Sequence, residues 1–152
     1  MRVYLVRHAK AEKEPPEGES GDAARRLAPQ GRALFSGLAR GLVAEMKVVR
    51  VLTSPLARAR ETAEILATLS KAPLEEEPAL ASGRSSGRVI LDLARRAGAG
   101  AALVGHNPEL AEAIALACGR EERVRPGTVA AIDLDDGDGD GRLAWLAAPE
   151  RE

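Results

Sequence analysis

The segment RVYLVRHA (residues 2–9) sets the pattern on which this fold is built. Its first part, residues 2–6, is dominated by β-branched and aromatic side chains, and the run stops at Arg7 and His8. A short apolar run that ends abruptly at charged residues is typical of a strand buried on both faces, as in a parallel sheet. We therefore expect a first strand inside the sheet that carries an Arg-His pair at its carboxyl end.

The same pattern recurs twice along the chain. Residues 48–52 are rich in valine and lead to Ser54, and residues 101–104 lead to His106. Because the carboxyl ends of parallel strands meet at one edge of an α/β sheet, the polar side chains after the three strands are expected to share one pocket.

Apolar periodicity predicts four helices around these strands. Ser54 and Asn107 are expected as N-caps, each followed by a proline at the first helical position, and Pro29 opens the first long helix. Gly98 and Gly119 follow the third and fourth helices, where glycine commonly ends a helix. The core-facing stripes are expected at Leu34, Phe35, Leu38, Leu42 and Met46; at Leu56, Ala59, Ala63 and Leu66; at Val89, Ile90, Leu93 and Ala97; and along residues 109–117.

The C-terminal part of the chain alternates instead, which predicts a hairpin of strands over residues 128–134 and 142–146, joined by an acidic turn at 135–141. Strands and helices that alternate along most of the chain predict an α/β fold. We expect a three-layer α/β/α sandwich whose central sheet is mostly parallel, with an antiparallel edge from the C-terminal hairpin. With 152 residues, of which 45% are hydrophobic, residues 1–152 are expected to form a single domain.

Composition narrows the classes of function. The 22 Lys and Arg residues nearly balance the 23 Asp and Glu residues, so the net charge favours neither nucleic acid nor a membrane surface as a partner. Cys118 is the only cysteine, which excludes an intrachain disulfide. The N-terminal segment lacks the apolar length of a signal or membrane-spanning segment, so a cytoplasmic protein is expected. Arginine outnumbers lysine and amide side chains are nearly absent, which favours a thermophile, although GC-rich coding explains the arginine equally well.

Arg58 is unusual for its position in the sequence. It stands in the first turn of the predicted second helix, where the positive end of the helix dipole disfavours a cation. An anion bound between the guanidinium and the helix N-terminus would explain this placement. Phosphate suits such a site, because arginine presents a planar fork of donors to its oxygens.

Two kinds of metal site compete with the phosphate interpretation. A zinc site built from the two histidines and an acid, Asp22 or Glu109, has neither an i, i+4 histidine pair nor multiple thiolates to support it. Residues 136–140 carry aspartates at the spacing of a calcium loop, but Ala147 stands where the bidentate glutamate belongs. No metal is therefore expected.

Four stretches of the chain form a recognisable set: VRHA (6–9), RRLAPQG (25–31), TSPLARARET (53–62) and VGHNP (104–108). Together they resemble the histidine phosphatase superfamily, the phosphoglycerate mutase-like group. Within that group, the short length and the stretch GTVAAI (127–132) are most similar to the small bacterial phosphohistidine phosphatases. Those enzymes act on phosphorylated histidine-containing phosphotransfer proteins, which the resemblance implies as partners.

The resemblance also implies a mechanism. His8 would be the nucleophile and form a phosphohistidine intermediate, while Arg7, Arg58 and His106 would bind the phosphoryl oxygens. Neither a metal nor an organic cofactor is implied. The roles are chemically sensible, because a neutral imidazole can attack phosphorus in line while guanidiniums, and a second imidazole if protonated, neutralise the transition state. Further substrate contacts are expected from Lys10, Arg25, Ser54 and Asn107.

Two departures from the family pattern bear on the substrate. Ala9 stands where glycine usually follows the nucleophile, which is harmless unless that backbone needs a positive φ. Residues 78–83 match the region where many phosphomonoesterases of the family carry an acidic proton donor, yet they contain no carboxylate, and Glu77 is the nearest candidate. An alkoxide leaves poorly without an acid, whereas an imidazole leaves readily once protonated, so phosphohistidine is favoured as the substrate.

Two other interpretations stay open. In the first, the protein hydrolyses small phosphomonoesters, such as sugar or nucleotide phosphates, with Lys10, Arg25 or the polar loop 11–22 holding the rest of the substrate; that loop is long enough to act as a lid. In the second, the chain is a non-catalytic phosphoprotein-binding module, against which the intact set of site residues counts. A monomer and a small homo-oligomer are equally compatible with the sequence.

Overall fold

The computed structural model describes residues 1–135 and 141–150. Its strands are β1 (Arg2–Arg7), β2 (Arg50–Thr53), β3 (Leu74–Glu76), β4 (Ala101–Gly105), β5 (Val129–Leu134) and β6 (Gly141–Ala147). Its α-helices are α1 (Pro29–Met46), α2 (Ala57–Ser70), α3 (Gly87–Ala97) and α4 (Glu109–Cys118), and two short 3-10 helices are η1 (Asp22–Ala24) and η2 (Pro78–Leu80). No helix within the described residues combines the length and the apolar character that crossing a bilayer requires.

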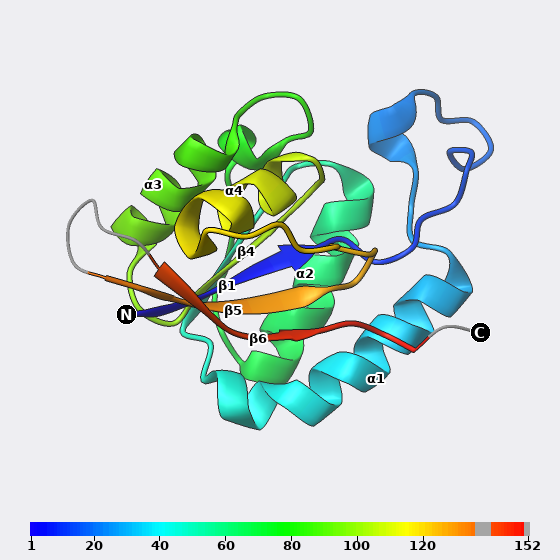
Figure 1. The fold of residues 1–152 in the computed structure, drawn as a ribbon. Coiled ribbons are helices and arrows are strands. Elements are labelled where there is room, and N and C mark those ends of the chain that lie inside the picture. Colours follow the sequence, from blue (N-terminus) through cyan, green and yellow to red (C-terminus); the bar gives the residue numbers. More distant parts are fainter. Residues whose placement is uncertain (136–140, 151–152) are drawn as a thin grey trace.

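The strands form one six-stranded sheet in the order β3-β2-β4-β1-β5-β6 (Figure 1). The first four of these strands are parallel to one another, whereas β5 is antiparallel to β1 and to β6. The predicted parallel sheet with an antiparallel edge is therefore confirmed. Residues 136–140, where the sequence predicts an acidic hairpin turn, lie outside the described residues.

Helices cover both faces of the sheet, because successive side chains of a strand point to opposite faces. Tyr4 and Val6 of β1 pack with α1 and α2, while Val3 and Leu5 pack with α3 and α4. All four side chains are at most 2% exposed. The pairing of α1 with α2 and of α3 with α4 confirms the three-layer sandwich (Figure 1).

The core-facing stripe of α1 is displaced by one residue from the predicted stripe. Phe35 and Met46 are buried as predicted, but the stripe between them runs through Ala39, and Gly31 extends it toward the N-terminus. The three predicted leucines, Leu34, Leu38 and Leu42, are only partly buried. Glycine is required at position 31 because the first turn lies close to the chain that follows β1, where a Cβ would collide with the Lys10 carbonyl oxygen.

The helix after β2 begins later than the sequence predicts. It starts at Ala57 rather than at Pro55, because Leu56 is extended (φ −68°, ψ 139°). The hydroxyl of Ser54 accepts a hydrogen bond from the Leu56 N–H (3.2 Å), so it caps a tight turn before the helix instead of the helix itself. Likewise α4 starts at Glu109, after Pro108, so Asn107 is not its N-cap as the sequence predicts.

Two elements differ from the sequence pattern for local reasons. The strand β3 was not predicted, since its three residues carry only one aliphatic side chain, and it pairs with β2 at the sheet edge. In α3, Val89 is 38% exposed rather than part of the core, and Leu91 and Ala94 are buried in its place. The predicted ends of α3 at Gly98 and of α4 at Gly119 are confirmed.

Candidate active site

Three neighbouring strand ends build the candidate site. Arg7 of β1 pairs with Gly105 of β4, so the residues that follow them, His8 and His106, leave the sheet side by side. Their ring centroids are 5.1 Å apart. Ser54 leaves β2 on the other side of β4, and all three of these polar side chains are at most 8% exposed. The structure thus brings together the strand ends that the sequence predicts to share a pocket.

The imidazole of His8 is arranged as a nucleophile. Its Nδ1 lies 2.7 Å from the carbonyl oxygen of Ala9, and because a carbonyl only accepts hydrogen bonds, Nδ1 carries the proton and Nε2 keeps a free lone pair. Burial, followed by the positive charges of Arg58, Arg7 and Arg25, lowers the pKa of His8 to about 4, against the raising effect of the Ala9 carbonyl. The ring is therefore neutral near pH 7, as attack on phosphorus requires.

The second imidazole is oriented by a serine. Nε2 of His106 lies 2.8 Å from Oγ of Ser54. The hydroxyl can donate to Nε2 or accept from its N–H, so this contact orients the ring in either neutral tautomer of His106. Burial and the neighbouring His8 and Arg58 lower the pKa of His106 to about 3. His106 is thus neutral in the free protein near pH 7, and a bound anion would raise its pKa, as the Asp22 carboxylate already does in part.

Two arginines flank the imidazoles. Arg7 donates from Nη1 to the carbonyl oxygen of Val124 (2.8 Å). Arg58, in the first turn of α2 and only 5% exposed, donates from Nη1 to the backbone oxygen of Asp22 and from Nη2 to its carboxylate, each at 2.9 Å. Burial lowers the pKa of Arg7, which remains a cation at neutral pH.

Several polar atoms of these residues are buried without a partner among the described residues: Nε of Arg7, Nε of Arg58 and Nδ1 of His106. Leaving a buried polar group unpaired costs about 1–3 kcal/mol, and a bound ligand can remove this cost by supplying the partner. Here three of them surround one nucleophilic imidazole. An anionic ligand with several acceptor oxygens fits this arrangement.

The other predicted contacts fall into two groups. Arg25 lies near the site, since its charge acts on His8, and its Nε is 3.0 Å from the Asp22 carboxylate. Lys10 follows the β1 end and is exposed. By contrast, the Asn107 side chain donates to the Val124 oxygen (3.0 Å) and accepts from the Ala111 N–H (3.3 Å), so both its polar groups serve the fold.

The carboxylates considered for other roles are engaged elsewhere. Glu77 accepts from the Ala79 N–H (3.0 Å) and caps η2. Glu109, weighed as a zinc ligand, accepts from the Gly83 N–H (2.7 Å). Within residues 1–135 and 141–150, no group of three or more His, Cys, Asp or Glu side chains is placed to hold a metal ion.

Two supporting roles were missed by the sequence analysis: that of Thr62, and that of Asp22, which was weighed only as a zinc ligand. Oγ1 of Thr62, which is fully buried, donates to the Arg58 carbonyl oxygen (2.8 Å) and accepts from the Ala9 N–H (3.0 Å), so it ties the nucleophile segment to α2. Its i, i+4 spacing from Arg58 is the signal that could have identified it. Asp22, the partner of Arg58, has no comparable signal among the other acids of its loop.

Alanine fits at position 9, where the family usually has glycine, because the backbone there does not need a positive φ. Lys47 and Lys71 are the only non-glycine residues with positive φ in the described parts of the chain.

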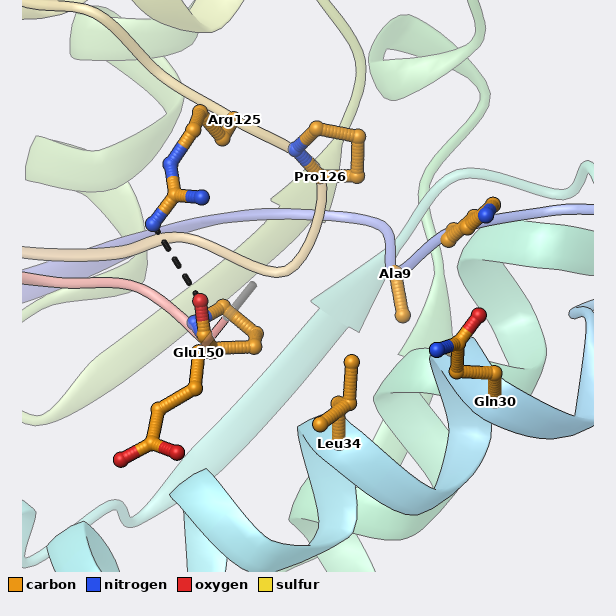
Figure 2. A pocket seen from close by; sticks show the side chains of 9 residues that line it. Ala9, Gln30, Leu34, Arg125, Pro126 and Glu150 are labelled. Carbon is orange, nitrogen blue, oxygen red and sulfur yellow. Dashed lines mark hydrogen bonds between the residues drawn. The ribbon is translucent and has the colours of Figure 1, made fainter. Parts of the chain in front are cut away.

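A pocket of about 410 Å³ adjoins the nucleophile segment. Figure 2 shows Ala9, directly after His8, pointing toward Leu34 of α1, with Arg125 and Pro126 on the opposite wall. Arg125 donates to the Pro149 carbonyl oxygen (3.2 Å), which holds the C-terminal segment against that wall (Figure 2). The pocket therefore offers an apolar lining with a charged rim next to the candidate phosphate site.

The protonation state of each of the two histidines can be measured directly by NMR. We expect both imidazoles to remain neutral at pH 5.5 in ¹H–¹⁵N spectra, because burial holds their pKa values at about 4 and about 3. Protonation of the second nitrogen of either ring would appear only as the pH falls below 5. The His8→Ala variant assigns the two sets of signals, and a midpoint near the ordinary value of about 6.5 for either ring would contradict the geometry described here.

Solved structures share this fold along nearly the whole chain. The protein histidine phosphatase SixA complexed with tungstate has a TM-score of 0.82 at 24% identity, covering 98% of this chain and 97% of that one. A candidate phosphohistidine phosphatase SixA from Agrobacterium tumefaciens gives 0.81 at 24% identity, covering 97% of each chain. A phosphoserine phosphatase from Entamoeba histolytica gives 0.69 at 14% identity, covering 95% of each. At these identities the likeness shows the fold alone.

Sequence comparison is more specific about the family. No curated protein sequence matches the chain. The sequence profile of the histidine phosphatase superfamily (branch 1), however, matches residues 3–97, which include the strand end with His8 and the helix turn with Arg58. On this match, covering more than half of its length, the chain belongs to the histidine phosphatase superfamily.

Proposed function

We propose that the protein is a phosphohistidine phosphatase that accepts the phosphoryl group of a phosphorylated protein histidine on Nε2 of His8. The observation that carries the proposal is the state of that atom: Nδ1 donates to Ala9, so Nε2 is unprotonated beside Arg7, Arg58 and His106. A histidine-containing phosphotransfer protein is the class of substrate we expect.

The reaction proceeds in two displacements. The Nε2 lone pair of His8 attacks phosphorus in line, the N–P bond of the substrate breaks, and the departing imidazole keeps the electron pair and takes up a proton from solvent. Water then attacks phospho-His8, the new N–P bond breaks with its electron pair returning to Nε2, and the water passes one proton to solvent, so that hydrogen phosphate leaves. In both steps the guanidiniums of Arg7 and Arg58 and the N–H of His106 stabilise the charge on the phosphoryl oxygens.

The choice of phosphohistidine rests on the leaving group. A monoester would need an acid to protonate its alkoxide, whereas an imidazole is protonated near neutral pH without one. Glu77, the predicted donor candidate, is hydrogen-bonded at the start of η2, and residues 78–83 hold no carboxylate. These features support the N–P substrate over a sugar or nucleotide phosphate, for which the pocket in Figure 2 would otherwise provide room.

Turnover of three kinds of substrate tests the proposal: a phosphorylated histidine-containing phosphotransfer protein, free phosphohistidine, and a panel of alkyl, sugar and nucleotide monoesters. We expect kcat/KM for the phosphoprotein to exceed that for every monoester by at least about tenfold. Glu77→Gln should change none of these rates more than about twofold, since the Glu77 carboxylate serves as a cap.

Other outcomes have definite meanings. A Glu77→Gln variant that loses nearly all activity toward alkyl phosphates would identify an acid-assisted monoesterase and contradict the assignment. Tight binding of the phosphoprotein without phosphate release would identify a binding module.

A further inference from the structure

We propose that Asp22 is a positioning residue of the phosphate site, whose carboxylate holds the guanidiniums of Arg58 and Arg25 in the arrangement that receives a phosphoryl group. The inference rests on the proposed function of the site. It concerns a residue outside the set that the sequence assigns to phosphate, and it gives the polar loop before α1 a role in the chemistry.

The contacts define the orientation of Arg58. Its two terminal nitrogens both bond residue 22, one to the backbone oxygen and one to the carboxylate, at 2.9 Å each. Two bonds to one residue fix the plane of the guanidinium as well as its position. The Nε side of the same guanidinium is left without a partner among the described residues. Residue 22 thus supplies both hydrogen bonds that orient the Arg58 guanidinium.

The same carboxylate also restrains a second cation. Its other oxygen lies 3.0 Å from Nε of Arg25, so one negative charge bridges two guanidiniums. The charges of Arg58, Arg7 and Arg25 all act on His8, which places three cations around one imidazole. Like charges at this density repel one another, and Asp22 offsets part of that repulsion while leaving the site net positive for a phosphoryl dianion.

The base of the segment that carries Asp22 is held by hydrogen bonds other than these ion pairs. The segment from residue 11 to residue 28 leaves the end of β1 and returns to α1 as an excursion beyond the strand ends (Figure 1). Its base is closed by hydrogen bonds from the Ala28 N–H to the Lys10 oxygen (3.0 Å) and from the Glu12 N–H to the Arg26 oxygen (2.8 Å). The Leu27 N–H donates to the carboxylate of Glu61 in α2 (2.8 Å). The excursion is therefore anchored to the helix that carries Arg58.

If the contact between Asp22 and Arg58 blocks the site instead of positioning Arg58, removal of the carboxylate has the opposite effect on oxyanion binding. If the Asp22 carboxylate merely fills the place of the phosphoryl group, its removal frees Arg58 and strengthens the binding of oxyanions. If it positions Arg58, its removal weakens that binding. The exposure of the two side chains favours positioning, because the Asp22 side chain is 65% exposed at the rim whereas that of Arg58 is 6% exposed beneath it.

Tungstate inhibition provides the test, because this tetrahedral dianion probes the phosphate site without turnover. We expect Asp22→Asn and Asp22→Ala to raise the inhibition constant of tungstate and to lower kcat/KM by about 10- to 100-fold, by analogy with the loss when a residue that orients a metal ligand is removed. Asp22→Glu, which keeps the charge, should recover part of the loss. Glu19→Gln is the matched control: it removes one negative charge from the same excursion, where Glu19 pairs with the exposed Arg26 at 3.2 Å, and it should behave as wild type.

The outcomes separate this inference from the proposed function. Unchanged or tighter tungstate binding in Asp22→Asn, with wild-type turnover of phosphohistidine, would overturn the positioning role alone. Equal losses in Asp22→Asn and Glu19→Gln would also overturn it, since general charge and not position would be responsible. A wild-type protein that neither binds tungstate nor turns over phosphohistidine would instead reject the proposed function.

Discussion

Alanine in place of His8 is expected to abolish the covalent phosphoenzyme. When wild-type protein is mixed with a radiolabelled phosphohistidine protein and quenched within milliseconds, we expect an acid-labile phosphoryl group on the chain. The variant lacks Nε2, the unprotonated atom that receives phosphorus, so no label should appear. Its kcat should fall by about 10⁴-fold or more, as is usual when a nucleophile is removed.

His106→Ala is the control for this experiment. It removes the neighbouring imidazole, whose ring centroid lies 5.1 Å away, but it keeps the nucleophile, so slow labelling should persist. Thermal unfolding of both variants shows whether the strand end remains intact. Equal labelling of wild type and His8→Ala would eliminate His8 as the phosphoryl acceptor.

Replacing Arg58 with alanine is expected to lower kcat/KM by about 10²- to 10³-fold, the loss observed when one preorganised donor to a developing negative charge is removed. The guanidinium is 6% exposed and is held by Asp22, so its position needs little reorganisation during the reaction. Its loss also removes a charge that lowers the pKa of His8, which should therefore rise from about 4. Both effects can be followed, by steady-state kinetics and by NMR titration.

Arg60→Ala is the matched control for Arg58→Ala. It removes the same side chain from the same helix two residues later, where Arg60 forms an exposed ion pair with Glu76. Exposed pairs contribute about 0–1 kcal/mol, so stability and kcat/KM should remain close to wild type. A loss in Arg60→Ala comparable to that in Arg58→Ala would mean that general positive charge, and not the placement of Arg58, supports activity.

Much of the candidate site could be predicted because its signals are local. An apolar run that stops at Arg7 and His8 marks a strand end, and a proline after the strand marks the turn into a helix. Arg58 stands out because it opposes the helix dipole, a conflict visible in the sequence itself. The central sheet follows from the alternation of strands and helices, which the six-stranded sheet confirms.

Features that depend on the packing of segments distant in the sequence could not be predicted in the same way. The buried stripe of α1 passes through Ala39 instead of Leu38, an offset of one residue that depends on how the helix packs on the sheet. The Ser54 hydroxyl turns from capping α2 to orienting His106, since β2 and β4 are neighbours in the sheet. The residue types alone indicate neither arrangement, because the same apolar stripe or capping residue is compatible with different packing partners.

The sequence by itself determined which residues stand at the ends of β1, β2 and β4, since each apolar run stops at polar or charged residues. Only the tertiary structure decided what those residues can do. The pairing of Arg7 with Gly105 sets His8 beside His106, and burial then makes both rings neutral. Asp22 reaches Arg58 across 36 positions of sequence, a contact that depends on the anchored loop. Proton positions and ion pairs arise from the surroundings of a group, and those surroundings exist only once the chain has folded.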